Sequence, residues 1–332
     1  MHSSTTIIFC LFAAVVLGQS ASAQSFSFLK APSHARLAGL GGVNVSLADR
    51  DINFFHNNPA LAGDTLNGSA SVGYQFYVGD VGNALFTYAH DLGDAGQLIA
   101  GIQHTNYGNI PGFDDTGAET GEYNADETAV LVGRSHQVGH FRLGASMKGV
   151  FSNIAGYRAT ALLLDVGGIF MHPQQDLTVA VVFKNMGFIL SDYTDGGLTN
   201  IPFDVQAGVT FKPEHMPLRF SLTAYELLES DLLSNADASE EEPSSLRKIF
   251  SHVNLGVEIL LHRNVNALVG YNYLLQHALR SETGGAGGGL SFGFAVMVKP
   301  VELVFSRNSY TVGNAGYSFS LLTNLNQLLR KK

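Results

Sequence analysis

From residue 67 onward, the sequence alternates with a period of two between large apolar residues and small or polar ones. In the segment FRLGASMKGVFS (141–152), the large apolar side chains share one face, and Arg142, Ser146 and Lys148 lie on the other. Successive side chains of a strand point to opposite faces, so each such segment is a candidate strand with one apolar face. We identify about fourteen candidate strands of about ten residues each. They start near residues 68, 80, 96, 128, 140, 158, 176, 202, 217, 250, 264, 286, 300 and 313.

This pattern predicts a membrane barrel. Strands of soluble sandwiches are mostly about five or six residues long, whereas strands of about ten residues with an apolar outside are typical of outer-membrane barrels. A closed barrel pairs every backbone group internally, as lipid requires. Only 14% of the residues are charged, against about 25% in ordinary globular proteins. We therefore expect an all-β fold, a transmembrane antiparallel β-barrel of residues 67–332. A soluble periplasmic β protein is the alternative.

The connections agree with a barrel, because long and short ones alternate. Short connections follow the even-numbered strands, near 91–95, 138–139, 262–264 and 299–300. Long ones follow the odd-numbered strands, at 107–127, 187–201, 227–249 and 275–285. Outer-membrane barrels combine short periplasmic turns with long outer loops. Two of the expected outer loops contain acidic stretches, at 113–127 and 229–245, which we interpret as solvated loops, with partner docking or divalent-cation bridging to lipid headgroups as alternatives.

The N-terminus predicts export. Residues 7–17, IIFCLFAAVVL, have the length of a signal-peptide apolar core, and Ala21-Ser22-Ala23 matches a cleavage site before Gln24. We expect residues 1–23 to be a cleaved signal peptide, residues 24–66 to form an N-terminal segment, and the barrel to insert in the outer membrane. Cys10 is the only cysteine, so the mature chain has no disulfide, cysteine nucleophile or cysteine metal site.

The sequence offers no catalytic constellation, and we expect neither an enzyme nor a cofactor. The net charge of −9 gives no basic footprint for nucleic acid. His136 and His140 flank a turn, but two imidazoles without a third ligand make a weak metal site. The glycine-rich stretch 284–293 lacks the Lys-Ser/Thr of a phosphate loop and leads into a strand. Glycines there can make room inside a barrel or permit bending.

Several charged residues fall on the predicted inward face of the strands. We expect them mainly to form pairs or to contact a plug in the lumen, with a transport path as the alternative. They are Arg142, Lys148, Asp165, Lys184, Asp204, Arg219, Glu258 and Glu302.

Residues 24–66 resemble the N-terminal segment of FadL-like outer-membrane barrels. The matching residues are a glycine turn at Leu40-Gly41-Gly42 and the motif Asn58-Pro59-Ala60. The resemblance implies that this segment folds into the lumen as a hatch. The stretch DINFFHNNPALA (51–62) would then close the pore: Asp51, Asn53, Asn57 and Asn58 can bond to backbone and lumen charges, and Phe54, Phe55 and Leu61 can pack against small wall residues.

A closer resemblance is to PorQ-like subunits of the type IX secretion system of Bacteroidetes. It rests on the order of blocks such as FSFLKAPSHARLAGLGG, DRDINFFHNNPALA, LGASMKGVFSNIAGYRATALLLDVGGIF and IPFDVQAGVTFK. It implies a non-enzymatic barrel of the attachment complex, which links cargo to lipopolysaccharide. The implied partners are PorZ-, PorU- and PorV-like proteins and outer-membrane lipid. A FadL-like transporter of hydrophobic small molecules is the alternative function.

Overall fold

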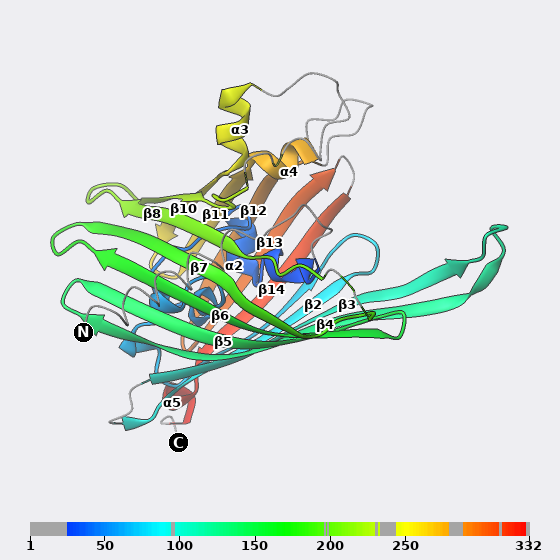
Figure 1. Ribbon diagram of the computed structural model, residues 1–332. Coiled ribbons are helices and arrows are strands. Elements are labelled where there is room, and N and C mark those ends of the chain that lie inside the picture. Colours follow the sequence, from blue (N-terminus) through cyan, green and yellow to red (C-terminus); the bar gives the residue numbers. More distant parts are fainter. Residues whose placement is uncertain are drawn as a thin grey trace, which may run out of the picture.

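The computed structural model describes residues 25–93, 97–195, 197, 199–229, 232, 244–278, 288–311 and 314–329. Within them, antiparallel strands form a closed barrel, with each strand beside its sequence neighbours and β1 beside β14 (Figure 1). The strands are β1 (Ser69–Phe76), β2 (Gly82–Asp91), β3 (Gln97–Phe113), β4 (Glu119–Val138), β5 (Phe141–Ile154), β6 (Tyr157–Met171), β7 (Asp176–Ser191), β8 (Asp204–Lys212), β9 (Leu218–Ala224), β10 (Val253–His262), β11 (Val265–Asn272), β12 (Leu290–Val298), β13 (Val301–Thr311) and β14 (Asn314–Asn324). The predicted fold class is confirmed.

The two faces of the wall differ as the alternation predicts. On β5, Leu143 is 64% exposed and Met147 50% exposed on the outer surface, while Ser146 and Lys148 are buried on the lumen side. β8 repeats the pattern, with Asp204 buried facing the lumen. Apolar side chains therefore cover the exterior, and polar or small side chains line the interior, as expected for a barrel in lipid.

The strand lengths correct one prediction. β3 to β7 have 14 to 20 residues, longer than the ten expected. The apolar alternation marks only the part of a strand that crosses the apolar layer, so a strand that continues into water gives no such signal. For the same reason, the loop predicted at 107–127 is wrong. β3 and β4 continue as a two-stranded ribbon whose register runs to Phe113↔Glu119.

The other long connections are partly structured. β7 continues to Ser191, into the loop expected at 187–201. Helix α3 (Ser245–Ser251) precedes β10, and helix α4 (Tyr273–Ala278) follows β11. Most of the acidic stretch 229–245 lies outside the described residues, and so do residues 284–287 of the glycine-rich stretch 284–293, whose last four residues begin β12.

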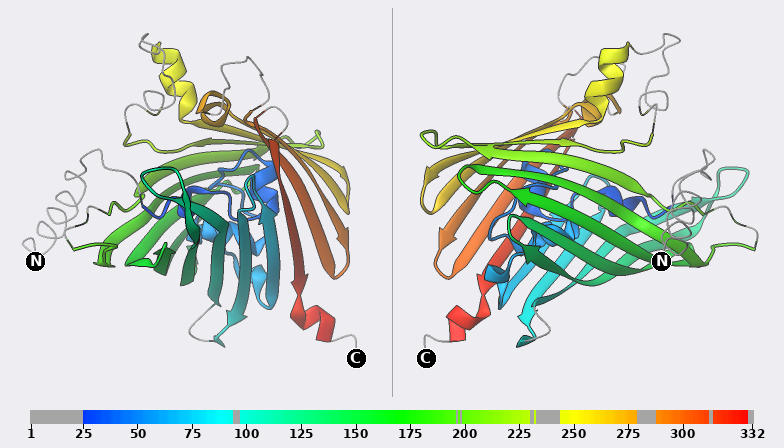
Figure 2. Two further views of the ribbon diagram at one scale, coloured as in Figure 1. Left: turned by 90° about the vertical axis from the view of Figure 1, so that its right-hand side faces the viewer. Right: turned by 60° about the vertical axis from the view of Figure 1, so that its left-hand side comes forward.

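The barrel has two distinct ends. The loop end carries the β3–β4 ribbon, α3 and α4, and the turn end carries the short connections and helix α5 (Leu325–Leu329), as Figure 2 shows. The turn between β4 and β5 has only Gly139 and His140. None of the described helices is long and apolar enough to cross a membrane.

Residues 25–66, the lumen segment, lie inside the barrel (Figures 1 and 2). Short helices shape it: η1 (Ser27–Lys30), α2 (Ala35–Gly39), η2 (Ile52–His56), η3 (Pro59–Leu61) and η4 (Asp64–Leu66). α2 packs against β11 to β14 and β1, and η3 packs against β4 to β6 on another part of the wall. The segment therefore crosses the lumen and supplies much of its apolar core. Phe54 and Leu61 belong to a buried cluster with Ala180 and Ala295 of the wall.

Candidate functional site

The Asn58-Pro59-Ala60 motif forms a capped turn against the wall. Asn58 is the N-cap of η3, and its side-chain oxygen accepts a hydrogen bond from the Ala60 N–H at 2.9 Å. Its amide nitrogen donates to the carbonyl of Val45 at 2.9 Å, which joins two parts of the lumen segment. Pro59 at the first helical position has no N–H to leave unsatisfied. The motif thus holds a tight turn with its polar groups paired in a buried place.

The lumen segment contacts the wall closely at glycine positions. A Cβ on Gly144 of β5 would collide with the backbone of Pro59 and Ala60, and one on Gly167 of β6 would collide with the Asn58 side chain. On the other side of the lumen, Gly270 of β11 lies equally close to the backbone of Gly41. A side chain at any of these positions would push the segment away, because packed interiors leave no spare room. We name Gly144, Gly167 and Gly270 the glycine seats.

The Gly41-Gly42 turn uses the conformational freedom of glycine. Both residues have φ of 94°, a left-handed region that side chains rarely adopt. Asn254 of β10 donates to the carbonyls of Leu40 at 2.9 Å and Val43 at 2.6 Å. The side chain of Asn254 therefore holds the turn against β10. This role of Asn254 was not predicted from the sequence.

A buried network of charges joins the lumen segment to β9 and β10 near the turn end. Arg36 of α2 pairs with Asp49 at 2.5 Å and with Glu258 of β10 at 2.8 Å. Arg219 of β9 completes the network, 2.8 Å from Glu258 and 3.3 Å from Asp49. Two guanidinium groups thus neutralise two carboxylates, as buried charges require. Arg36 holds the pKa of Asp49 below its usual range, against the effect of burial.

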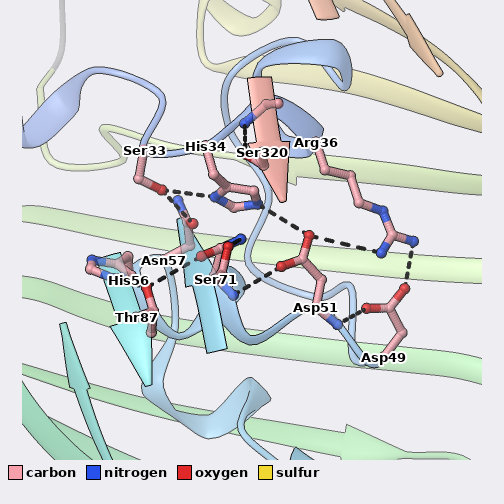
Figure 3. Close-up of polar contacts among 12 residues, drawn as sticks. Ser33, His34, Arg36, Asp49, Asp51, His56, Asn57, Ser71, Thr87 and Ser320 are labelled. Carbon is pink, nitrogen blue, oxygen red and sulfur yellow. Dashed lines mark hydrogen bonds and ion pairs between the residues drawn. The ribbon is translucent and has the colours of Figure 1, made fainter. Parts of the chain in front are cut away.

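Asp51 lies beside this network, between His34 and Arg36, and its Oδ2 is 4.0 Å from the Arg36 guanidinium (Figure 3). The Asp51 Oδ2 and His34 Nε2 atoms are 3.8 Å apart, and neither makes a hydrogen bond to the described residues. Burial raises the pKa of the Asp51 carboxyl to about 7, with Arg36 opposing the shift. Burial also lowers the pKa of His34 well below its usual value, so the imidazole stays neutral.

A second charged group faces the lumen from β5 to β8. Lys148 pairs with Asp165 at 2.8 Å and donates to the Asn185 side chain. Asp204 accepts a hydrogen bond from the Glu226 N–H at 2.7 Å. Lys184 is buried and lines two small polar cavities, of ≈ 20 and ≈ 60 Å³, against the lumen segment. These spaces are large enough for water molecules but too small for an organic solute.

The remaining predicted residues of this face also contact the lumen. Arg142 donates to the Leu61 carbonyl at 3.3 Å, at the end of η3. Glu302 lines a polar depression of ≈ 490 Å³ at the turn end, together with Arg36 and Arg219. All eight predicted lumen charges therefore lie on the inner side of the wall, and five of them bond directly to one another or to the lumen segment. Among the described residues, no group of three or more His, Cys, Asp or Glu could hold a metal ion.

An apolar pocket in the loop half of the lumen is filled by the chain itself. Phe26 and Phe28 are 2% and 3% exposed there, against the inner face of β4 to β6. The wall side chains around the two rings are apolar and mostly short: Ala129, Val150, Ala159, Ala161 and Leu163. Phe26 has a left-handed φ of 56°, which costs a bulky residue about 1–3 kcal/mol. This pocket was not predicted from the sequence, although the alanines at inward positions of β6 indicate space on that side of the wall.

These features define an outer-membrane barrel closed by its own N-terminal segment. The chain is similar in structure to the P. putida toluene transporter TodX, with a TM-score of 0.53 and 12% identity, over 89% of this chain and 99% of that one. A mutant of TodX, described as a monoaromatic hydrocarbon channel, gives a TM-score of 0.58 at the same identity and coverage.

A FadL homologue of Pseudomonas aeruginosa aligns over 88% of this chain and 98% of its own, at 11% identity and a TM-score of 0.47. No protein-family model and no curated protein matches the sequence. The protein shares the barrel fold of the TodX chains.

Proposed function

We propose that this FadL-like barrel admits small hydrophobic molecules across the outer membrane. The observation that carries the proposal is the apolar pocket filled by Phe26 and Phe28. A phenylalanine side chain is a benzyl group, so the pocket already accommodates rings of the size of toluene. The structurally similar TodX chains are described as a toluene transporter and a monoaromatic hydrocarbon channel, which supports this candidate more directly than the secretion candidate below.

The route would open when the N-terminal part of the lumen segment leaves the pocket. The strained backbone of Phe26 favours release. Lys30 restrains it, because its ammonium pairs with Glu226 at 2.6 Å near the pocket. The charged network and the glycine seats hold the rest of the segment, so only residues 25–29 need to move.

Uptake of labelled toluene by cells tests this function. Cells that make the protein should take up toluene faster than cells that lack it. The double substitution Phe26→Ala and Phe28→Ala should raise the rate further, because it empties the pocket. Phe151→Ala, on the outer surface, is the matched control and should leave the rate unchanged. Equal uptake with and without the protein would contradict transport.

A second candidate is the non-enzymatic subunit of the type IX attachment complex, of the PorQ-like kind, that anchors surface partners. The ordered sequence blocks support it, and so does the apolar surface at the loop end. Leu246 is 67% exposed and Ile249 60% exposed on α3, outside the barrel wall. Affinity purification from native outer membranes should recover PorZ-, PorU- and PorV-like proteins. Recovery of the barrel alone, with normal cargo display in a deletion strain, would exclude this candidate.

A further inference from the structure

The β3–β4 ribbon projects beyond the barrel wall with both of its edges unpaired. β2 accompanies β3 only as far as Gly82↔Asn106. β5 accompanies β4 only as far as Ala125↔Ile154. Beyond these points, β3 and β4 pair only with each other, through Asn109↔Asn124 to Gly112↔Gly121. Figure 1 shows the ribbon reaching away from the barrel.

An isolated two-stranded ribbon is marginally stable in water, because it has too little apolar surface to bury. This ribbon also exposes apolar side chains. Ile110 and Tyr123 are cross-strand partners that are 42% and 45% exposed, and Phe113 is 58% exposed. The tip is nevertheless well defined, since the Asp114 carboxylate accepts hydrogen bonds from the Thr116 and Ala118 N–H groups at 2.8 and 3.0 Å. An ordered ribbon with free edges is a template for another strand.

The two edges differ. The β3 edge contains Pro111 and an irregularity between Asn106 and Asn109, both of which hinder strand pairing. The β4 edge has no proline, and its own irregularity lies at the tip, between Gly121 and Glu119, so Gly121–Asn124 stay in regular register. The Asn124 carbonyl accepts from the Ala155 N–H, so the N–H and C=O of Asn124 point toward this edge. Two residues earlier, the backbone groups of Glu122 point to the same side and have no strand beside them.

The negative charge of the ribbon favours a positively charged partner. Residues 107–126 contain five acidic residues and no Lys or Arg. An approaching acidic strand would be repelled, whereas a basic one would be attracted, more strongly at low salt. We infer that the β4 edge at Gly121–Asn124 docks an extended, basic polypeptide segment of a partner protein by strand addition. The inference is independent of the transport function proposed above, because it uses no residue of the lumen.

Peptide binding to the whole barrel in detergent micelles tests the inference. The probe is a fluorescent ten-residue peptide of alternating Lys and Val, and the readout is fluorescence anisotropy. Two variants separate backbone pairing from charge: Glu122→Ala removes the side chain only, and Glu122→Pro also removes the N–H at the free edge. We expect Glu122→Pro to bind about tenfold more weakly than Glu122→Ala, the effect of one lost hydrogen bond.

Two controls complete the design. A peptide of alternating Glu and Val should not bind, and the heat-modifiable gel mobility of both variants should match that of the unchanged protein. Equal binding by the Pro and Ala variants would overturn strand addition, since charge alone would then explain the affinity. Equal binding of the acidic peptide, or no binding of the basic one, would overturn the inference as well.

Discussion

The backbone of Pro59 lies directly against Gly144 of β5, with no room for a side chain between them. Gly144→Ala should therefore displace η3 from the wall, at a cost of about 1–3 kcal/mol in unfolding free energy. We also expect larger ion conductance in planar bilayers, because the plug no longer seals. Gly149→Ala is the matched control on the same strand, where the nearest atom to a new Cβ is the Phe151 ring at 3.6 Å. If Gly144→Ala and Gly149→Ala had the same unfolding free energy and the same conductance, a glycine at position 144 would not be needed to hold η3.

Replacing both Asn58 and Pro59 with Ala should loosen the lumen segment. The change removes the cap on the Ala60 N–H and the bond to Val45, each worth about 1 kcal/mol. Permeability of the outer membrane to large antibiotics should rise, as measured by growth inhibition. Asn58→Ser alone keeps a capping oxygen for the Ala60 N–H and adds no buried charge, so it should have a smaller effect. Normal permeability in the double variant, with normal folding, would show that the motif only fills space.

Arg36 is the key cation of the buried network, so Arg36→Met should destabilise the barrel strongly. The loss leaves Glu258 with one partner fewer in a buried place, and breaking such a pair costs about 3–5 kcal/mol. Adding Glu258→Leu should restore part of the stability, as denaturant unfolding in lipid vesicles can measure. Arg158→Met, at an exposed position, serves as the control. A double variant as unstable as Arg36→Met would argue against charge pairing as the cause.

The contribution of Asp51 to stability should fall as the pH rises from about 4 to about 7, opposite in sign to the contribution of the buried His34, whose pKa is lowered. The pKa of Asp51 in the folded protein is about 7, above the value of about 3.9 in an unfolded chain. The folded state therefore holds a proton that the unfolded state has lost, and stability declines until the pH exceeds the folded pKa. Asp51→Asn should remove this decline and raise the unfolding midpoint at pH 8. A difference in midpoint between the unchanged protein and Asp51→Asn that stays constant from pH 4 to pH 8 would contradict this assignment.

The sequence by itself determined the barrel. The alternation on β5 correctly separates the outward Leu143 and Met147 from the inward Ser146 and Lys148, because the side-chain period of a strand is local. The same periodicity predicted the fourteen strands and their order. It could not predict the ribbon, since Ile110 and Tyr123 lie in water, where neither face has to be apolar.

Only the tertiary structure decided how the lumen is filled. Gly144 and Gly270 look alike in the sequence, but barrel closure alone brings the first against Pro59 and the second against Gly41. The same holds for Arg36 and Glu258, whose pairing joins residues from opposite ends of the chain. These contacts depend on which wall positions face a given point of the lumen. Strand order, register and closure together set those positions, and no local pattern in the sequence contains them.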